Sequence, residues 1–151
     1  MGVYNFNKDI VTGQDGEKVV LEHIISMTDA TLIDTNHDNK FDFMVDKDGV
    51  RRTYEVKTDE YCRAGYDNGN LFVEIECRGK ASGIVVTQAD WFVFYLPHRK
   101  QIWYIESDRL RELIAVNDFR KTENSGDKNS RTIGYLIPRR KFKNHFKVYE
   151  L

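Results

Sequence analysis

The sequence has no long apolar run. Its longest runs, residues 92–96 and 83–86, are far shorter than the roughly 20 residues that a membrane-spanning helix requires. The first residues also lack the basic and apolar regions of a signal peptide. We therefore expect a protein with no membrane partner.

Cysteine and proline are both scarce, with two of each in 151 residues. Cys62 and Cys77 form no CxxC pair and are too few to build a disulfide framework. Free thiols are typical of a reducing compartment, so we expect a cytoplasmic location. The four histidines are scattered and show none of the spacings that bind zinc.

The sequence also lacks an excess of charge of one sign, with 23 Lys and Arg against 24 Asp and Glu. A formal net charge of −1 argues against a protein that coats nucleic acid by bulk charge. The charges are unevenly spread, because acids dominate residues 29–60 whereas residues 139–143 are mostly basic. An acidic centre with basic flanks fits a metal site that acts on a polyanion, and it equally fits an ordinary mixed surface.

A chain of 151 residues that is 40% hydrophobic and 31% charged suits one domain, 1–151, with a real core. Helical spacing of apolar residues predicts helices over 14–27 and 107–116. Polar residues 121–130 are expected to form a mobile loop, and the C-terminal segment 139–147 is basic. Strands are expected over 31–33, 41–45, 53–56, 71–77, 91–96, 101–105, 135–137 and 146–149. This order predicts an α/β or α+β domain around a central mixed β-sheet.

The triplet Glu55-Val56-Lys57 ends one of these predicted strands. Because strand side chains alternate, Glu55 and Lys57 lie on one face. A carboxylate can bind a hard divalent cation, and a lysine can orient water or stabilise developing negative charge. The preceding strand carries a second acid, Asp42, among apolar neighbours, where acids are unfavourable. Together these residues indicate a metal-dependent site that cleaves phosphodiesters.

Glu17 on the first helix, then Asp42, then Glu55-Val56-Lys57 resemble the core of the PD-(D/E)XK nuclease superfamily. That group includes restriction enzymes, Holliday junction resolvases and phage nucleases. The resemblance covers roughly the first two thirds of the chain, and it implies a restriction-endonuclease-like αβββαβ core. Phe41 stands where the named motif has proline.

The resemblance also implies a role for each motif residue. Asp42 and Glu55 would bind Mg²⁺ or Mn²⁺ together with the carbonyl of Val56. Lys57 would position the attacking water or stabilise the transition state, and Glu17 would lie near the metal. The implied protein is a Mg²⁺-dependent DNA endonuclease of phage or prokaryotic type, acting in a microbial cytoplasm or, if viral, in that of the host.

Small size favours structure-guided or weakly sequence-specific, resolvase-like cleavage, and a homodimer would allow paired cuts. The alternative is a non-catalytic domain of the same fold that binds nucleic acid or another protein. Residues expected to lie around the metal or the substrate are Glu74, Thr87, Gln88, Arg78, Lys80, Arg139 and Arg140. For each of them a solvated surface position or a helix cap is the competing interpretation.

A rival pattern overlaps this region. Asp34, Asn36, Asp38 and Asp42 occupy positions one, three, five and nine of an EF-hand-like calcium loop. The pattern then fails, because Asn39 replaces the glycine at position six and Val45 replaces the final bidentate acid. A structural Ca²⁺ loop therefore remains a separate hypothesis.

Overall fold

The computed structural model describes the backbone of residues 5–35, 40–60, 62, 64–124 and 131–151, and their side chains except those of 5–14 and 124. The helices are α1 (Asn5–Thr28), α2 (Ser107–Val116) and α3 (Arg139–Phe142), with 3₁₀ turns η1 (Gly83–Val85), η2 (Pro97–Arg99) and η3 (Lys143–His145). The strands are β1 (Thr31–Thr35), β2 (Phe43–Lys47), β3 (Val50–Thr58), β4 (Asn70–Cys77), β5 (Lys80–Ala81), β6 (Trp91–Leu96), β7 (Gln101–Glu106), β8 (Arg120–Asn124), β9 (Thr132–Pro138) and β10 (Lys147–Glu150).

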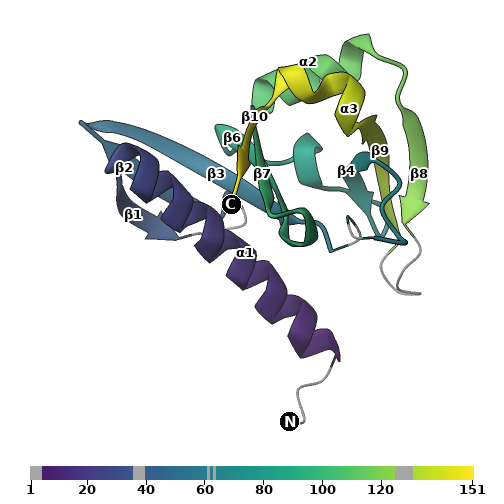
Figure 1. Cartoon of the computed structure of the whole chain (residues 1–151). Coiled ribbons are helices and arrows are strands. Elements are labelled where there is room, and N and C mark those ends of the chain that lie inside the picture. The colour runs from purple at the N-terminus through teal and green to yellow at the C-terminus, as the bar shows by residue number, and fades with distance from the viewer. Residues whose placement is uncertain (1–4, 36–39, 61, 63, 125–130) are drawn as a thin grey trace.

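A six-stranded mixed sheet in the order β1-β2-β3-β6-β7-β10 forms the centre of the molecule (Figure 1). Only β3 and β6 pair in parallel, whereas the other neighbours are antiparallel. β2 and β3 form the predicted hairpin, whose tight turn places Asp48 and Gly49 at positive φ. Helices flank this sheet, so the predicted α+β class with a central mixed sheet is confirmed.

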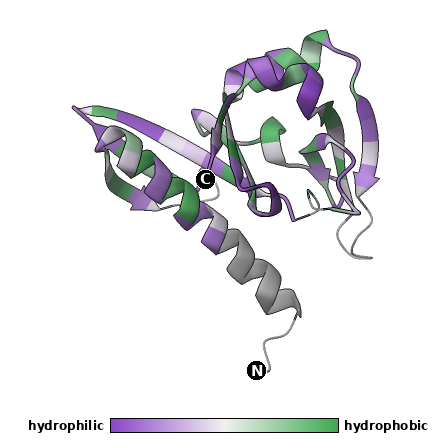
Figure 2. Cartoon of the chain, viewed as in Figure 1, coloured by the Kyte–Doolittle hydropathy of each residue, from purple (hydrophilic) through white to green (hydrophobic). Residues whose placement is uncertain are grey.

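Helix α1 covers one face of the central sheet. Val20 and Ile24 pack against a cluster that includes Val45, Val56 and Val93. Figure 2 shows apolar positions along the part of α1 that lies over the sheet. Gly16 lets the helix approach β3 closely, because a Cβ there would lie 2.0 Å from Thr58 Oγ1. The residue next to Gly16, Glu17, is thereby held beside the end of β3.

A second, four-stranded sheet in the order β5-β4-β9-β8 was not expected. The predicted strand 71–77 is present as β4, but it belongs to this sheet. Leu71, Val73 and Ile137 pack with β6, β7 and α2 in a second core. The opposite face of the same strands carries polar and aromatic side chains. Alternation of side chains across the strands produces this division.

Three other sequence predictions differ from the structure. The first helix was expected over 14–27, but α1 begins at Asn5. The connection between β3 and β6, where an αβββαβ core has a helix, contains β4, β5 and the single turn η1. The start of the expected loop 121–130 is strand β8, and residues 125–130 lie outside the described residues. The pairing of β8 with β9 explains this strand, because polar residues join a sheet edge readily when one face remains solvated.

The predicted strands β1, β6, β7, β9 and β10 and helix α2 are present, with bounds shifted by a few residues at most. Among the described residues, no helix combines the length and the apolar character needed to cross a bilayer.

Candidate active site

Glu55 and Lys57 share one face of β3. Each is paired in register with a core residue of β6, Phe92 and Phe94 respectively, on the side away from α1. Glu55 Oε2 lies 3.2 Å from Lys57 Nζ. Exposed fractions are 16% for the Glu55 side chain and 37% for Lys57. The structure therefore forms the predicted acid–lysine pair, with the lysine reaching toward solvent.

Asp42 lies just before β2, at the point where β2 stops pairing with β3. Its N–H donates to the carbonyl oxygen of Tyr54 (2.8 Å). Its Oδ2 accepts the N–H of Val56 (2.7 Å), where another strand residue would have supplied a backbone carbonyl. The N–H and C=O of a strand residue point to the same edge, so the carbonyl of Val56 points to this gap beside Asp42.

Glu17 approaches the same gap from α1. Burial, together with the negative charges of Asp42 and Glu55, raises the pKa of Glu17 to about 7. A hydrogen bond between the Glu17 and Asp42 carboxyl groups favours the proton on Glu17 and the charge on Asp42. Three acids therefore converge at one edge of β3, and near neutral pH one of them retains a proton.

Burial sets the electrostatics of the remaining groups. It raises the pKa of Glu55, which the nearby Lys57 ammonium only partly offsets. It also raises the pKa of Asp42, against the N–H of Val56 and the charge of Lys57. Burial by itself lowers the pKa of Lys57, but the carboxylates of Glu55, Glu74 and Asp42 outweigh it and raise that pKa above its ordinary value. Lys57 is thus a stable cation beside carboxyl groups whose pKa values are raised.

The donor set at this edge is chemically suited to Mg²⁺ or Mn²⁺. Asp42, Glu55 and the carbonyl of Val56 supply only oxygen atoms, which hard cations prefer. Within the described part of the chain, no three His, Cys, Asp or Glu side chains are grouped as a ready metal shell. Mg²⁺ is usually held by one or two carboxylates, with water and substrate phosphate completing its coordination, and the pair Asp42 and Glu55 fits that pattern.

Thr87 connects the segments that carry the two acids. Its Oγ1 lies 3.4 Å from both Glu55 Oε1 and the carbonyl oxygen of Lys40. The N–H of Gln88 donates to the same carbonyl (3.0 Å). Thr87 is therefore a buried positioning residue, as the sequence hypothesis allowed. The side chain of Gln88 is exposed.

Arg111 of α2 is a positioning residue that the sequence did not suggest. Its Nη2 donates to the carbonyl oxygen of Thr87 (2.7 Å), and its Nε donates to that of Ile84 (3.1 Å). These bonds hold the segment 84–87 against the helix. An arginine at helical spacing among polar residues gives no local sign of such a role, because its acceptors lie more than twenty residues away.

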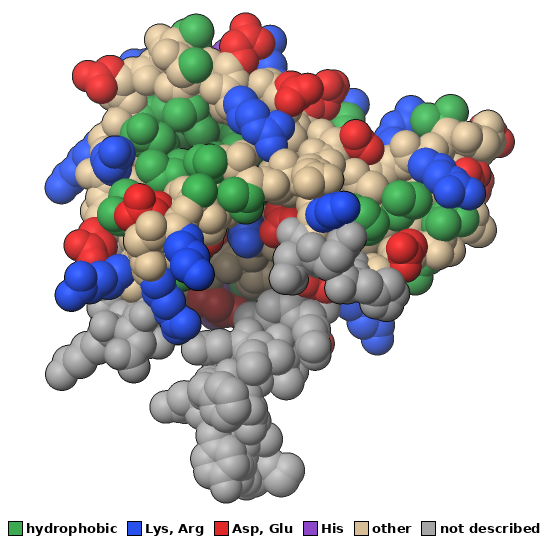
Figure 3. Space-filling model, turned by 180° about the vertical axis from the view of Figure 1, so that it is seen from behind, with side chains coloured by type: hydrophobic (Ala, Val, Ile, Leu, Met, Phe, Trp, Pro, Cys, Tyr) green, Lys and Arg blue, Asp and Glu red, His purple; other side chains and the backbone are tan. Residues whose placement is uncertain are grey.

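A cavity of about 850 Å³ adjoins Lys57, and we name it the inter-sheet cleft. One wall is the end of β3 with the following residues 59 and 60, and the other is the face of the second sheet that bears Phe72, Glu74 and Leu136. Glu74 therefore neighbours the site, as predicted, and attracts Lys57. Figure 3 shows a hollow in the surface with acidic side chains deep in it and several Lys and Arg side chains beside it.

Arg78 and Lys80 lie away from the acids. Both are exposed, Arg78 in the turn that joins β4 to β5 and Lys80 at the start of β5, and Arg78 has positive φ. Neither is among the charges that shift the pKa values of Glu17, Asp42, Glu55 and Lys57.

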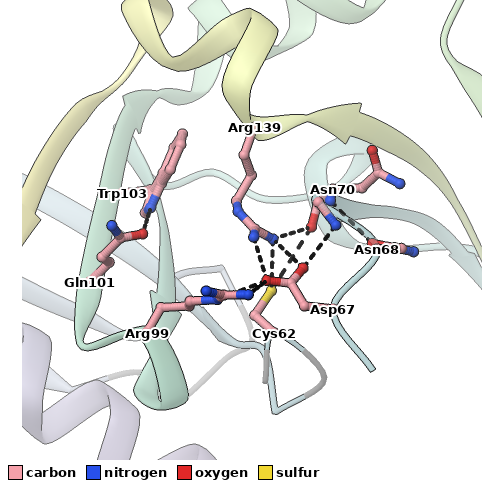
Figure 4. A network of polar contacts seen from close by, with 9 residues as sticks. Cys62, Asp67, Asn68, Asn70, Arg99, Gln101, Trp103 and Arg139 are labelled. Carbon is pink, nitrogen blue, oxygen red and sulfur yellow. Dashed lines mark hydrogen bonds and ion pairs between the residues drawn. The ribbon is translucent and has the colours of Figure 1, made fainter. Parts of the chain in front are cut away.

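Arg139 was expected to lie near the metal or the substrate, but in the structure it is bonded to side chains of the protein. Its guanidinium bonds both Asp67 oxygens (2.9 and 2.5 Å) and also Cys62 Sγ (3.1 Å), as Figure 4 shows. Arg99 binds the same carboxylate (2.6 Å). Arg139 thus fixes the loop that borders the cleft, whereas Arg140 is exposed on α3. Burial, with Asp59 nearby, raises the pKa of the Cys62 thiol to about 12.

The calcium-loop hypothesis falls partly outside the described residues, because Asn36 and Asp38 lie there. Of the residues in that pattern, Asp34 is in β1 and Asp42 bonds Val56.

No protein-family model matches the sequence, and no curated protein matches it. Among solved structures, the chain is similar to a bacterial homing endonuclease, I-Ssp6803I, with a TM-score of 0.50 and 16% identity. The similarity covers 65% of this chain and 68% of that chain. At this identity the likeness establishes the fold alone, so we conclude that the protein has an endonuclease-like mixed α+β fold.

Proposed function

We propose that this protein is a metal-dependent endonuclease that hydrolyses phosphodiester bonds in DNA. The observation that carries the proposal is the convergence of Glu17, Asp42, Glu55 and Lys57 where β2 leaves β3. This is the residue set of the PD-(D/E)XK resemblance, and it lies within an endonuclease-like fold. The likeness to a homing endonuclease supports a nuclease but leaves metal use and substrate as proposals.

Asp42, Glu55 and the carbonyl of Val56 would hold Mg²⁺ or Mn²⁺. The bound metal would lower the pKa of water and neutralise charge on the scissile phosphate. Lys57, kept protonated by Glu55 and Glu74, donates to the phosphate oxygen on which charge develops, or orients the attacking water. Glu17, whose pKa is raised to about 7, is partly protonated near neutral pH, which limits repulsion among the three acids. The buried Thr87 keeps Glu55 in place.

Purified protein incubated with branched and linear DNA and Mg²⁺ tests this proposal. We expect Asp42→Asn, Glu55→Gln and Lys57→Met each to reduce cleavage by about a hundredfold or more. Glu76→Gln is the matched control, since Glu76 lies on β4 but outside the inter-sheet cleft, and it should cut like wild type. A wild-type protein that cuts no better than Lys57→Met would contradict the assignment.

The non-catalytic alternative predicts a different pattern. A binding domain of this fold would bind DNA in a salt-sensitive manner, with no effect of EDTA or of Glu55→Gln, and would cut nothing. A homodimer remains a proposal that sedimentation of the wild-type protein, with and without DNA, can examine.

A further inference from the structure

The inter-sheet cleft has an aromatic wall next to Lys57. Phe72 of β4 lines the cleft and is only partly buried, so part of its ring faces the cleft. A Cβ at Gly134 of the neighbouring β9 would lie 2.7 Å from Phe72 Cζ and 2.9 Å from Cε1. The ring therefore lies across Gly134. A glycine inside a strand normally weakens it, and here it leaves the space that the ring occupies.

Cationic side chains stand on both sides of this ring. Arg120 and Phe72 are both in register with Leu136, so the three side chains form one row on the cleft face of the second sheet. Lys57 faces them from the end of β3. At the mouth, Tyr66 supplies a second aromatic ring with an exposed fraction of 64%. The cleft thus combines stacking surfaces with two cationic side chains, Lys57 and Arg120, while its lining also includes the carboxylates of Asp59, Glu60, Glu74 and Glu123.

The size of the cleft limits what can enter. Its volume of about 850 Å³ lies within the range of roughly 300–1,000 Å³ typical of sites that enclose small molecules. A nucleotide fits such a space. A double helix does not, because a space of the size that encloses one small molecule is too small for paired strands, so paired DNA must remain outside.

We propose that the inter-sheet cleft accepts an unpaired nucleotide of the DNA substrate, with its base stacked on Phe72 and its phosphates between Arg120 and Lys57. The choice of DNA as the ligand rests on the proposed function. It names the substrate class as DNA that is unpaired beside the cut, such as a fork or a flap. Aromatic stacking tolerates any base, so the cleft selects strand structure over sequence.

Fluorescence anisotropy in EDTA tests the inference without requiring cleavage. The probes are a labelled fork with one unpaired arm, the isolated arm, and a blunt duplex. Phe72→Leu should weaken binding of the fork and the arm by about 5- to 140-fold, as expected for the loss of one stacked base. Phe72→Tyr keeps the ring and should bind like wild type. Duplex binding should not change in either variant.

A pair of neighbouring exposed residues provides a second test that does not disturb the core. Arg120 lines the cleft, whereas Lys121 points to the other face of β8, with its Nζ 5.9 Å from the centre of the Tyr135 ring. Arg120→Ala should lower affinity for the unpaired arm and reduce the salt dependence by about one phosphate contact. Lys121→Ala removes the same charge and should change neither.

Equal losses on fork and duplex, or wild-type binding by both Phe72→Leu and Arg120→Ala, would overturn the inference. Its failure is distinguishable from failure of the proposed function. A protein that binds the fork through Phe72 but cuts no DNA with Mg²⁺ contradicts only the proposed activity. A protein that cuts, yet binds fork and duplex equally in every variant, contradicts only the unpaired-nucleotide cleft.

Discussion

Within the acid cluster of Glu17, Asp42 and Glu55, Glu17 has the pKa that is raised most clearly above its ordinary value. Its pKa of about 7, against an ordinary value of 4.5, reflects burial first and the charges of Asp42 and Glu55 second. The folded protein therefore keeps a proton that the unfolded chain releases at lower pH. Stability must then fall as the pH rises from about 4.5 to about 7, and remain lower above that range.

Replacement of Glu17 by glutamine should remove this loss. We expect Glu17→Gln to be about 2–3 kcal/mol more stable than wild type at about pH 8, and close to wild type at about pH 4.5. Urea unfolding at both pH values, without divalent metal, measures the difference. Glu22→Gln, at an exposed position of the same helix, should show no such pH dependence. A Glu17→Gln variant that is equally stable relative to wild type at both pH values would contradict the raised pKa.

The grouping of the candidate site residues was predictable because its signal is local. Glu55 and Lys57 are two positions apart on a strand, and an acid within an apolar run made Asp42 conspicuous. Thr87 was named only as a neighbour, and Arg111 was missed, since their partners are backbone carbonyls brought close by the fold. Arg139 was expected at phosphate, and its commitment to Asp67 depends on a contact across 72 positions.

At the level of elements, η1 and β4 approach each other more closely than any side chain would permit. Gly83 has φ of +58°, and a Cβ there would lie 2.2 Å from the carbonyl oxygen of Glu74. Only glycine fits both the backbone conformation and the contact. This contact positions the strand that supplies Glu74 and Phe72 to the inter-sheet cleft.

Two glycine substitutions separate the cost of a left-handed backbone conformation from the cost of a steric clash with β4. Gly83→Ala should destabilise the protein by about 3 kcal/mol, because it combines left-handed strain with a backbone clash. Gly49→Ala should cost only about 1 kcal/mol, because Gly49 has φ of +81° but no atom within 4 Å of the added Cβ. Unfolding in urea gives both values. Similar losses in the two variants would show that η1 does not pack against β4 as described.

The loop between β3 and β4 is held by the ion pair of Asp67 with Arg139. The Asp67 side chain is 4% exposed, and its hydrogen bond to Arg139 lowers its pKa to about 2 from an ordinary 3.8. Since the folded pKa is depressed, this stabilisation is present above about pH 4 and is lost as the pH falls toward 2.

Asp67→Asn should therefore cost about 3 kcal/mol at neutral pH, because it leaves a largely buried guanidinium without its counter-ion. The difference from wild type should shrink toward about pH 2. Asp108→Asn removes the ion pair between Asp108 and Arg111. The Asp108 side chain is 98% exposed, so this change should lower the free energy of unfolding by less than about 0.5 kcal/mol. Chemical denaturation across this pH range decides the matter, and a cost for Asp67→Asn that is constant with pH would contradict the account.

The elements themselves followed their sequence patterns well. Continuous apolar runs gave β6 and β7, and helical spacing gave α2. The division of strands into two sheets was not predictable, because β4 alternates in the same way whichever sheet it joins. The polar strand β8 was missed for a similar reason, since only its pairing with β9 makes it a strand.

Across the whole molecule, β6 joins the two cores. Phe92 and Phe94 face the core shared with the second sheet, whereas Val93 faces α1. A strand that contributes to both cores cannot leave one of them intact when it separates from the other. The molecule should therefore unfold as one cooperative unit.

Each core has its own tryptophan with which to check this. Trp103 is buried in the larger core, and Trp91 packs against the cluster beneath α1. Trp91→Phe and Trp103→Phe leave one reporter each. Within either variant, we expect the fluorescence transition in urea to coincide with the loss of helical circular dichroism. A Trp91 signal that changes well before the circular dichroism would show that the α1 side unfolds separately.

The second sheet is assembled from two separate parts of the chain, β4 and β5 before β6, and β8 and β9 after α2. During synthesis the ribosome delivers Glu17, Asp42, Glu55 and Lys57 long before β8 and β9 emerge. The charged groups are thus synthesised early, while the wall that carries Arg120 and Gly134 follows later. A nascent chain therefore contains the candidate site residues before it can form the inter-sheet cleft, which is complete only after β8 and β9 have been synthesised.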